Sequence, residues 1–271
     1  MEKKKVLFIT TEVEPFVPEN RCSLKGRMLP QCIQEAGHEI RTFSPKWGII
    51  NERRNQLHEV IRLSGMNLII DDTDHPLIIK VASLPSAKMQ VFFIDNDDYF
   101  TKRGILTDKE GKEYADNGER AIFYARGVLE TVKKQGWVPD VIHCYGWIAA
   151  LAPLYIKKAY SDEPSFRNTK VVMEISPREF EQDFGIENAN FVEYKDAHYE
   201  DIQDLCTEAY GHNELEKIGV KFADGVIVEN KDVNPSIVEY AKSLGLPVLG
   251  PIEGDSFKEA YSEFYESLFK E

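Results

Sequence analysis

The sequence has few cysteines, and none of them lie close together. Its 271 residues include four, Cys22, Cys32, Cys144 and Cys206, with no CxxC pair, and its six histidines are equally dispersed. Zinc sites are built from close-spaced Cys or His pairs, so we expect no structural metal. Separate free thiols suit a reducing compartment, which leads us to expect a cytoplasmic protein.

Long apolar runs and basic residues are also scarce. No stretch approaches the roughly 18 uninterrupted apolar residues of a membrane-spanning helix. The charged start leads into an apolar run at 6–9 that is too short for a signal peptide. Acidic residues number 46 against 33 basic ones, for a net charge of −13. A nucleic acid requires a basic face, so we expect neither a nucleic-acid partner nor a membrane.

Three catalytic or phosphate-binding motifs are missing from the sequence. It contains no GxGxxG dinucleotide loop, no GxxxxGK[ST] phosphate loop and no GxSxG nucleophile elbow. We therefore expect no cofactor, and nucleophilic catalysis would depend on scattered residues.

What the sequence does contain is an alternation of strand and helix patterns. A β-branched apolar run at 5–10 is followed by helical spacing at 24–36, a glycine at position 37 and a second strand at 39–43. This order is typical of a βαβ unit in a parallel sheet. Further strands are predicted at 139–144, 170–175, 225–228 and 247–250, and further helices at 118–135, 147–159, 215–222, 235–243 and 256–269.

Two segments depart from this alternation. Short strand-like runs at 59–63, 67–71, 77–84 and 89–95 are separated by turn residues, Ser64-Gly65 and Asp74-His75-Pro76, and indicate a hairpin-rich insertion. The acidic, aromatic stretch 177–212 has no clear period and is interpreted as a long loop with at most one helix. The prediction is an α/β fold: a single doubly wound, mainly parallel Rossmann-like sheet over residues 1–271.

Some residues allow both a functional and a structural interpretation. Asp95, Asp97 and Asp98 could bind a hard cation or form a solvated turn. His143 ends an apolar strand at the edge where α/β sheets bind ligands, but it could equally be a hydrogen-bonded structural residue. Trp47, Trp137 and Trp147 could stack on sugars, although large aromatic side chains usually belong to the core. The aromatic stripe of the helix at 256–269 is expected to pack on the domain.

Several phrases in the sequence resemble the bacterial ADP-glucose-dependent glycogen and starch synthases. They occur in the family's order, from residue 5 to about residue 228. They are Thr11-Glu12-Val13-Glu14-Pro15-Phe16; Phe93-Ile94-Asp95-Asn96 with Tyr99-Phe100; Tyr114-Ala115-Asp116-Asn117-Gly118-Glu119-Arg120; Gly136-Trp137-Val138-Pro139-Asp140-Val141-Ile142-His143; and, more weakly, Lys217-Ile218-Gly219-Val220-Lys221-Phe222-Ala223-Asp224. The resemblance implies the N-terminal half of a GT-B glycosyltransferase, a starch synthase catalytic domain.

The active-site phrases of the family are mostly replaced. In the family, a Lys-x-Gly-Gly loop holds the phosphates of the nucleotide sugar, and here those positions are Pro18, Asn20 and Arg21. Side chains at two glycine positions obstruct the approach of a diphosphate to the backbone. The aspartate after the loop falls at Leu24. Two further family motifs, His-x-His-Asp-Trp-His and Thr-x-His-Asn, are replaced by His143-Cys144-Tyr145-Gly146-Trp147-Ile148 and Glu174-Ile175-Ser176-Pro177.

These departures lead to two hypotheses about function. The first is a glycogen synthase-like pseudoenzyme that is not catalytic on its own and has a binding or regulatory role linked to glycogen biosynthesis. The alternative is a glucosyltransferase that transfers glucose from ADP-glucose to an α-1,4-glucan once a separate polypeptide supplies the second, nucleotide-sugar domain of the family, which has no counterpart in these 271 residues. We expect the chain alone to be inactive, because the leaving diphosphate must be neutralised by positive groups. We name no catalytic residue.

The resemblance also suggests where a ligand would bind. In a two-domain synthase the carboxyl ends of the strands form half of a cleft, and we expect this face to be exposed here. Its candidate ligand or glucan-binding residues are Glu12, Asp116, Asn117, Arg120, His143, Tyr145 and Trp147. The occupants we expect are a maltooligosaccharide, a protein partner or a second copy of the chain, unless the segment 177–212 or the helix at 256–269 covers the face.

Overall fold

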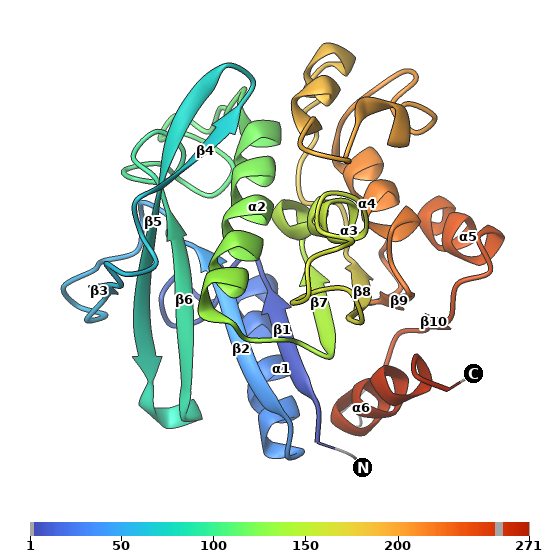
Figure 1. Cartoon of the computed structure of the whole chain (residues 1–271), viewed down its shortest axis with the longest axis horizontal. Helices are drawn as coiled ribbons and strands as arrows, with labels where there is room; N and C mark the ends of the chain where they lie inside the picture. Colours follow the sequence, from blue (N-terminus) through green and yellow to red (C-terminus); the bar gives the residue numbers. More distant parts are fainter. Residues whose placement is uncertain (1–2, 253–256, 271) are drawn as a thin grey trace.

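A mixed sheet of ten strands organises the computed structural model, which describes residues 3–252 and 257–270 (Figure 1). The strands lie in the order β10-β9-β8-β7-β1-β2-β6-β5-β3, with β4 paired to β5. Pairing is parallel from β10 to β6 and antiparallel where β5 meets β6, β3 and β4. The bounds are β1 Lys5–Ile9, β2 Glu39–Pro45, β3 His58–Glu59, β4 Met66–Ile70, β5 Thr73–Leu84, β6 Met89–Asp95, β7 Val141–Tyr145, β8 Lys170–Ile175, β9 Gly225–Val228 and β10 Val248–Leu249. The predicted mainly parallel α/β fold is confirmed.

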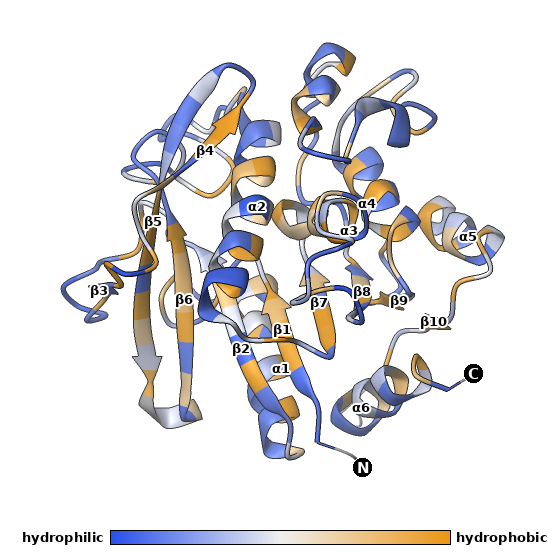
Figure 2. Cartoon of the chain, viewed as in Figure 1, coloured by the Kyte–Doolittle hydropathy of each residue, from blue (hydrophilic) through white to orange (hydrophobic). Residues whose placement is uncertain are grey.

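Helices cover both faces of the parallel strands. Strand β1 shows why: Val6 and Phe8 belong to one core cluster, whereas Leu7 and Ile9 belong to the other. Successive side chains of a strand point to opposite faces, so an uninterrupted apolar strand needs cover on both. Helices α1 (Arg21–Glu35) and α6 (Phe257–Ser267) pack on the first face. The second face carries α2 (Asn117–Gln135), α3 (Ala152–Lys157), α4 (His212–Lys221) and α5 (Pro235–Ser243). Figure 2 shows the central strands β1, β6 and β7 as the hydrophobic centre.

The hairpin-rich insertion is present, with two corrections. Of the predicted strand at 59–63 only Glu59 is extended, as the second residue of β3, because a turn bonded from the Leu63 N–H to the Val60 carbonyl follows it. The turn predicted at 74–76 lies inside β5 instead. The chain reverses earlier, at Asp71, whose φ of 50° lies in the left-handed region.

The apolar helix predicted at 147–159 is also divided. A 3-10 turn, Trp147–Ala149, precedes the short helix α3, which has Pro153 in its first turn. Proline fits the first turn of a helix because it lacks an N–H to donate, and so it favours a new start at this point. The stretch 177–212 is irregular as predicted, with the 3-10 turns Ile186–Val192 and Tyr199–Asp201.

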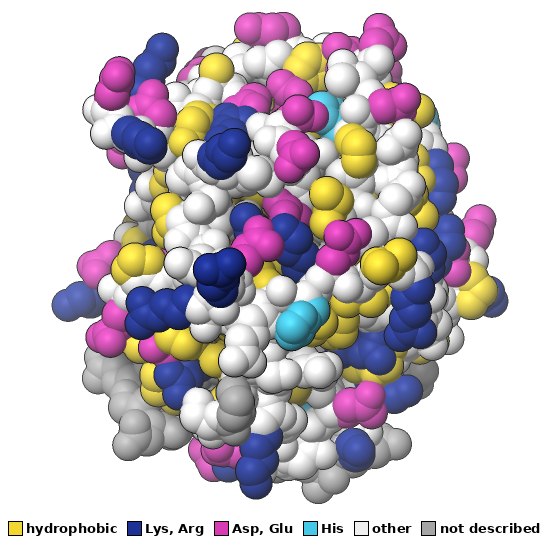
Figure 3. All heavy atoms as spheres, turned by 90° about the vertical axis from the view of Figure 1, so that its left-hand side faces the viewer, with side chains coloured by type: hydrophobic (Ala, Val, Ile, Leu, Met, Phe, Trp, Pro, Cys, Tyr) yellow, Lys and Arg dark blue, Asp and Glu magenta, His cyan; other side chains and the backbone are white. Residues whose placement is uncertain are grey.

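The aromatic stripe of α6 packs on the sheet, as the sequence predicts. Tyr261, Phe264, Tyr265 and Leu268 are buried in the cluster that also contains Val141. Ser256, where the predicted helix begins, lies outside the described residues. The outer face beside β3, β4 and β5 mixes acidic and basic side chains (Figure 3). No helix among the described residues is long and apolar enough to cross a membrane.

Candidate functional site

The loop after β1 ends in a closed helix cap. Asn20 Oδ1 accepts the Ser23 N–H at 2.9 Å, and Ser23 Oγ accepts the Asn20 N–H at 2.9 Å. This capping box uses donors at the start of α1, the kind of site where a helix can bind an anion. The Asn20 amide also donates to Glu12 at 2.6 Å. Asn20 stands where the resemblance implies a glycine, and its side chain is hydrogen-bonded within the loop and the first turn of α1.

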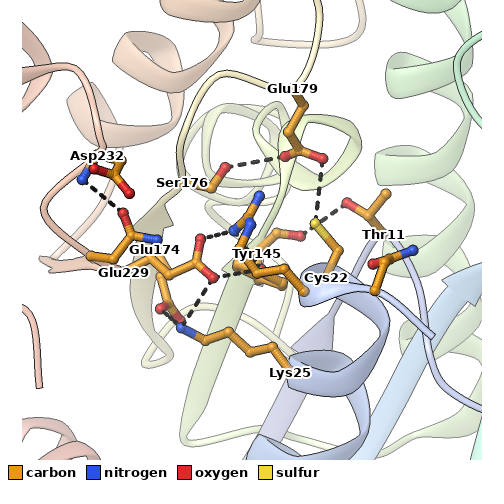
Figure 4. Close-up of polar contacts among 12 residues, drawn as sticks. Thr11, Cys22, Lys25, Tyr145, Glu174, Ser176, Glu179, Glu229 and Asp232 are labelled. Carbon is orange, nitrogen blue, oxygen red and sulfur yellow. Dashed lines mark hydrogen bonds and ion pairs between the residues drawn. The ribbon is translucent and has the colours of Figure 1, made fainter. Parts of the chain in front are cut away.

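An ion pair between the partly buried Lys25 and the fully buried Glu174 links α1 to the end of β8. Lys25 on α1 is paired with Glu174 (Figure 4), and Tyr261 donates to the same carboxylate at 2.7 Å. The other Glu174 oxygen lies 2.9 Å from His143 Nε2, and His143 Nδ1 lies 2.8 Å from the Tyr265 hydroxyl. Burial alone raises the pKa of Glu174, but the Lys25 ammonium and the His143 bond lower it to about 2. Glu174 is therefore a permanent anion at neutral pH.

A second cation, Arg21, is also paired at the carboxyl ends of the parallel strands. Arg21 forms an ion pair with Glu229, which directly follows β9, and donates to the Tyr145 hydroxyl at 3.2 Å. Tyr145 in turn donates to Glu229 at 3.0 Å. Arg21 and Tyr145 occupy positions where the family has a phosphate-loop glycine and the histidine that faces the transferred sugar. Here both side chains bind the chain's own carboxylate.

Two further carboxyl groups, those of Glu179 and Glu216, are hydrogen-bonded to the same residue, Ser176. Ser176 Oγ lies 3.1 Å from both Glu179 and Glu216, and the Ser176 N–H donates to Glu216 at 2.8 Å. Glu179 also accepts the Trp147 N–H at 3.2 Å, and Figure 4 shows its contact with Ser176. Burial raises the pKa of Glu179 to about 7 and that of Glu216 to about 8. One Glu216 oxygen has no partner among the described residues.

Carboxyl groups outnumber cations at this edge of the sheet. The acidic members are Glu12, Glu174, Glu179, Glu216 and Glu229, and the basic members are Arg21 and Lys25. We call these seven residues the carboxylate cluster. Both cations are already paired with glutamates. Glu174 stays ionised, and neither cation of the cluster is unpaired, so a diphosphate entering here would meet no free positive group among these seven residues.

The candidate residues from the sequence are largely inaccessible. Six of the seven, all except Asp116, have less than a tenth of their surface exposed. The expectation of an exposed half-cleft formed by these residues is therefore wrong for six of them. Their role in ligand binding stays a prediction.

The segment 177–212 covers part of this candidate set. Phe180 packs edge-on against Trp147 with ring centroids 5.5 Å apart, and Phe184 lies directly over Gly118. Asn117 donates to Gln182 at 3.3 Å. On the opposite face of the sheet, α6 covers His143 through Tyr261 and Tyr265. The irregular segment thus forms a lid of packed aromatic side chains, the arrangement that the sequence left open as an alternative.

The motif around Asp116 builds loop structure. Asp116 is paired with Arg103 at 2.7 Å, and its side chain remains partly exposed. Arg120 is buried and donates to the carbonyls of Tyr99, Ile105 and Gly104 and to the Asn117 side chain. These bonds fix the loop before α2.

The other ambiguous residues also have structural partners. Trp47, Trp137 and Trp147 are at most 5% exposed and belong to the core. Asp95 is paired with Lys80 at 2.8 Å, and Asp98 with His75 at 3.0 Å, so these two carboxylates point to different partners.

Sequence reasoning missed Lys25, Glu179, Glu216 and Glu229 as site residues. For two of them, Glu229 and Glu216, the sequence does contain an indication. Glu229 follows an apolar strand, and Glu216 lies four residues after His212, on the same face of α4. Glu174 interrupts the apolar strand β8, which itself indicates a compensated charge. Nothing in the local sequence indicates Glu179.

Comparisons with known proteins agree with this fold and with the family phrases. A family model described as the starch synthase catalytic domain matches residues 5–246. The glycogen synthase of Chlorobium luteolum is 41% identical over 172 residues, which cover 63% of this chain and 35% of the relative. The glycogen synthase of Chlorobaculum tepidum is 40% identical over the same length. The matched part is thus about a third of these relatives.

A solved structure supports the fold alone. The catalytic domain of starch synthase IV from Arabidopsis thaliana, bound to ADP and acarbose, superposes with a TM-score of 0.73 at 15% identity. The superposition covers 93% of this chain and 52% of that chain. Together with the family model, which spans most of the sequence, these findings show that the chain is glycogen synthase-like and belongs to the starch synthase catalytic domain family.

Proposed function

We propose that this chain is a non-catalytic, glycogen synthase-like domain that acts by binding, in a role linked to glucan metabolism. The observation that carries the proposal is the carboxylate cluster at the edge of the sheet where the family's nucleotide-sugar phosphates are expected. Arg21 and Lys25 are both paired there with the chain's own glutamates.

The electrostatics of transfer support this proposal. Departure of a nucleoside diphosphate is favoured by preorganised positive groups or N–H donors aimed at the developing charge. Here the start of α1 is closed by Asn20 and Ser23, and Glu174 stays ionised because of Lys25 and His143. Binding an anion at Arg21 would require breaking the Arg21–Glu229 pair, which would leave the largely buried Glu229 carboxylate with the Tyr145 hydroxyl and with Lys25 at 3.9 Å, a cation already paired with Glu174. Such a poorly compensated buried charge is unfavourable.

The proposed binding partner is a maltooligosaccharide, a protein or a second copy of the chain. A glucan is the class that the family resemblance suggests. Asp116 is the accessible member of the candidate set, so we expect a glucan contact to begin there. A protein partner or a second copy would instead cover a larger part of the lid formed by 177–212.

Two measurements test the proposal. The purified chain is assayed for glucose transfer from ADP-glucose and UDP-glucose to glycogen, with the Chlorobium luteolum glycogen synthase as the positive control. We expect no transfer, and calorimetry should show no binding of ADP. Turnover above about 1 per second, within the range of ordinary enzymes, would overturn the proposal.

The ligand is tested separately by titration with maltooligosaccharides and by measurement of the mass in solution. Binding that is lost in Asp116→Ala supports the glucan role. Binding that survives in the double variant Asp116→Ala with Tyr145→Ala would place the sugar elsewhere on the chain. No binding at millimolar sugar would leave a protein partner or a second copy as the binding role.

A further inference from the structure

A groove of the described surface lies between β4 and the segment 190–195. Its volume is about 740 Å³, and it shares no residue with the carboxylate cluster. Its lining includes Arg126, Glu130 and Lys133 of α2. The other lining comes from the strand and turn at 66–72 and from the residues around Tyr194. A groove of this size can hold a small organic molecule.

Arg126 is the unusual residue of this groove. It is 3% exposed, yet no described carboxylate lies within ion-pair distance of its guanidinium. One nitrogen, Nη1, donates to the Ile69 carbonyl, and the guanidinium lies 3.8 Å from the centre of the Tyr194 ring. Its Nε is buried without an acceptor among the described residues. A guanidinium has five N–H donors, so most of its hydrogen-bonding capacity is unused.

The neighbouring Arg120 shows how the same helix satisfies a structural arginine. Arg120 is completely buried and has no carboxylate partner within residues 3–252 and 257–270, but it donates four hydrogen bonds of 2.7–2.9 Å to oxygen atoms. Arg126 has a single oxygen acceptor in the described part of the chain. A buried charge is tolerated when it is paired or fully hydrogen-bonded, and Arg126 meets neither condition within the described chain.

Two lysines add positive charge to the groove. Lys195 lies over the rings of Tyr160 and Tyr194, at 4.6 and 5.1 Å from their centres, and has no described carboxylate partner. Lys133 is weakly paired with Glu130 at 3.6 Å and with Glu163 at 3.7 Å. These cations are notable in a chain with a net charge of −13.

The acidic residues of the groove are engaged elsewhere or lie at its rim. Glu130 accepts from the Tyr160 hydroxyl at 2.6 Å, and Glu193 accepts from the Tyr199 N–H at 2.7 Å and lies 2.8 Å from His198. Asp71 and Asp72 are exposed in the turn after β4. None of these four carboxylates lies within ion-pair distance of Arg126.

We infer that this groove binds a small organic anion whose carboxylate or phosphate head pairs with Arg126. Both heads present two oxygens to a guanidinium, which is the geometry that arginine recognises best. Lys195 and Lys133 stabilise the negative charge, and Phe191 and Tyr194 supply apolar surface for the body of the ligand. The site is independent of the proposed function, because it would stand whether or not the chain transfers glucose.

The experiment is calorimetric titration of the full chain at low ionic strength with two probes, inorganic phosphate and succinate. Binding of phosphate alone identifies a phosphate head, and binding of succinate alone a carboxylate head; binding of both shows that the site accepts either. The double variant Lys133→Gln with Lys195→Gln should weaken binding at least tenfold. Both lysines are partly or fully exposed, so the fold should survive this change. The matched control is Lys134→Gln, an exposed charge on the next residue of α2 that does not line the groove.

Arg126→Lys tests the bidentate contact while keeping the charge. We expect this variant to lose at least tenfold in affinity, with circular dichroism confirming that it is folded. If the variant does not fold, the lysine double variant still decides the question. The inference is overturned if neither probe binds at tens of millimolar, or if the lysine double variant and Lys134→Gln bind equally well.

Discussion

His143 lies between two buried partners, with Nε2 2.9 Å from Glu174 and Nδ1 2.8 Å from the Tyr265 hydroxyl. These bonds connect β7, β8 and α6, and Lys25 extends the connection to α1. Since both ring nitrogens have partners within the chain, the structural interpretation of His143 is favoured over a ligand contact. The histidine that survives from the family motif here joins four elements of the fold.

Lys25→Met should destabilise the protein by about 3 kcal/mol or more, because it leaves the buried Glu174 carboxylate without its cation. Urea unfolding followed by tryptophan fluorescence measures this loss. The double variant Lys25→Met with Glu174→Gln should recover much of the loss, since the uncompensated charge is gone. Lys134→Met, an exposed change on α2, is the control and should cost less than about 0.5 kcal/mol. Additive effects of the two single changes would contradict the proposed coupling.

The contribution of Glu216 to stability should fall as pH rises from about 5 to 8, whereas His212, whose pKa is lowered by burial to about 4, acts in the opposite direction below about pH 6.5. Burial raises the pKa of Glu216 to about 8 in the folded chain, against about 4.5 when unfolded. Between these values the folded state holds a proton that the unfolded state has released, so raising the pH favours unfolding by up to about 1.4 kcal/mol per pH unit for one group. Glu179, with a folded pKa of about 7, changes stability in the same direction.

Glu216→Gln removes one of these titrations and should make the pH dependence shallower. The Gln side-chain oxygen can still accept the Ser176 N–H. Urea unfolding at pH 5, 6, 7 and 8 compares this variant with Glu239→Gln, an exposed change on α5 that should leave the slope unaltered. If the free energy of unfolding changes equally with pH in the wild type and in Glu216→Gln, the raised pKa of Glu216 is contradicted.

Phe180→Ala should loosen the lid over the carboxyl edge. Phe180 contacts Trp147, Phe184 and His212, with ring centroids 5.2–5.5 Å apart. Removing a buried phenylalanine typically costs about 3–5 kcal/mol. Trp147 should become accessible, which shifts tryptophan emission to the red and increases quenching by acrylamide. Phe269→Ala changes a ring that is 39% exposed and serves as the control, for which we expect no spectral change.

Restoring the family's phosphate loop should not produce a glucosyltransferase. The triple variant Pro18→Lys, Asn20→Gly and Arg21→Gly removes the cation that is paired with Glu229. The edge therefore stays acidic, and the diphosphate is still not neutralised. Release of ADP from ADP-glucose in the presence of glycogen should therefore stay at background. Turnover comparable to that of the Chlorobium luteolum enzyme would contradict this and show that the loop replacement alone caused the inactivity.

The order of the elements was readable from the sequence where local pattern decides structure. The run at 5–10 and the spacing at 24–36 predicted β1 and α1, because strand and helix periodicities are properties of neighbouring residues. The predicted position of a turn was wrong where a nearby proline also favoured a turn. Pro76 suggested a turn, but its position in β5 opposite Asn67 is compatible with strand pairing, and Asp71 supplied the reversal.

The sequence by itself determined the family, the alternation of strands and helices, and the replacement of the phosphate-loop glycines by side chains. Only the tertiary structure decided what those side chains do. Arg21 meets Glu229 across 208 residues of chain, and Lys25 meets Glu174 across 149. Contacts over such separations depend on how α1 packs against the ends of β8 and β9, which no local pattern specifies. The same holds for Arg126: that no acidic partner lies beside it among the described residues becomes visible only when β4, α2 and Tyr194 come together.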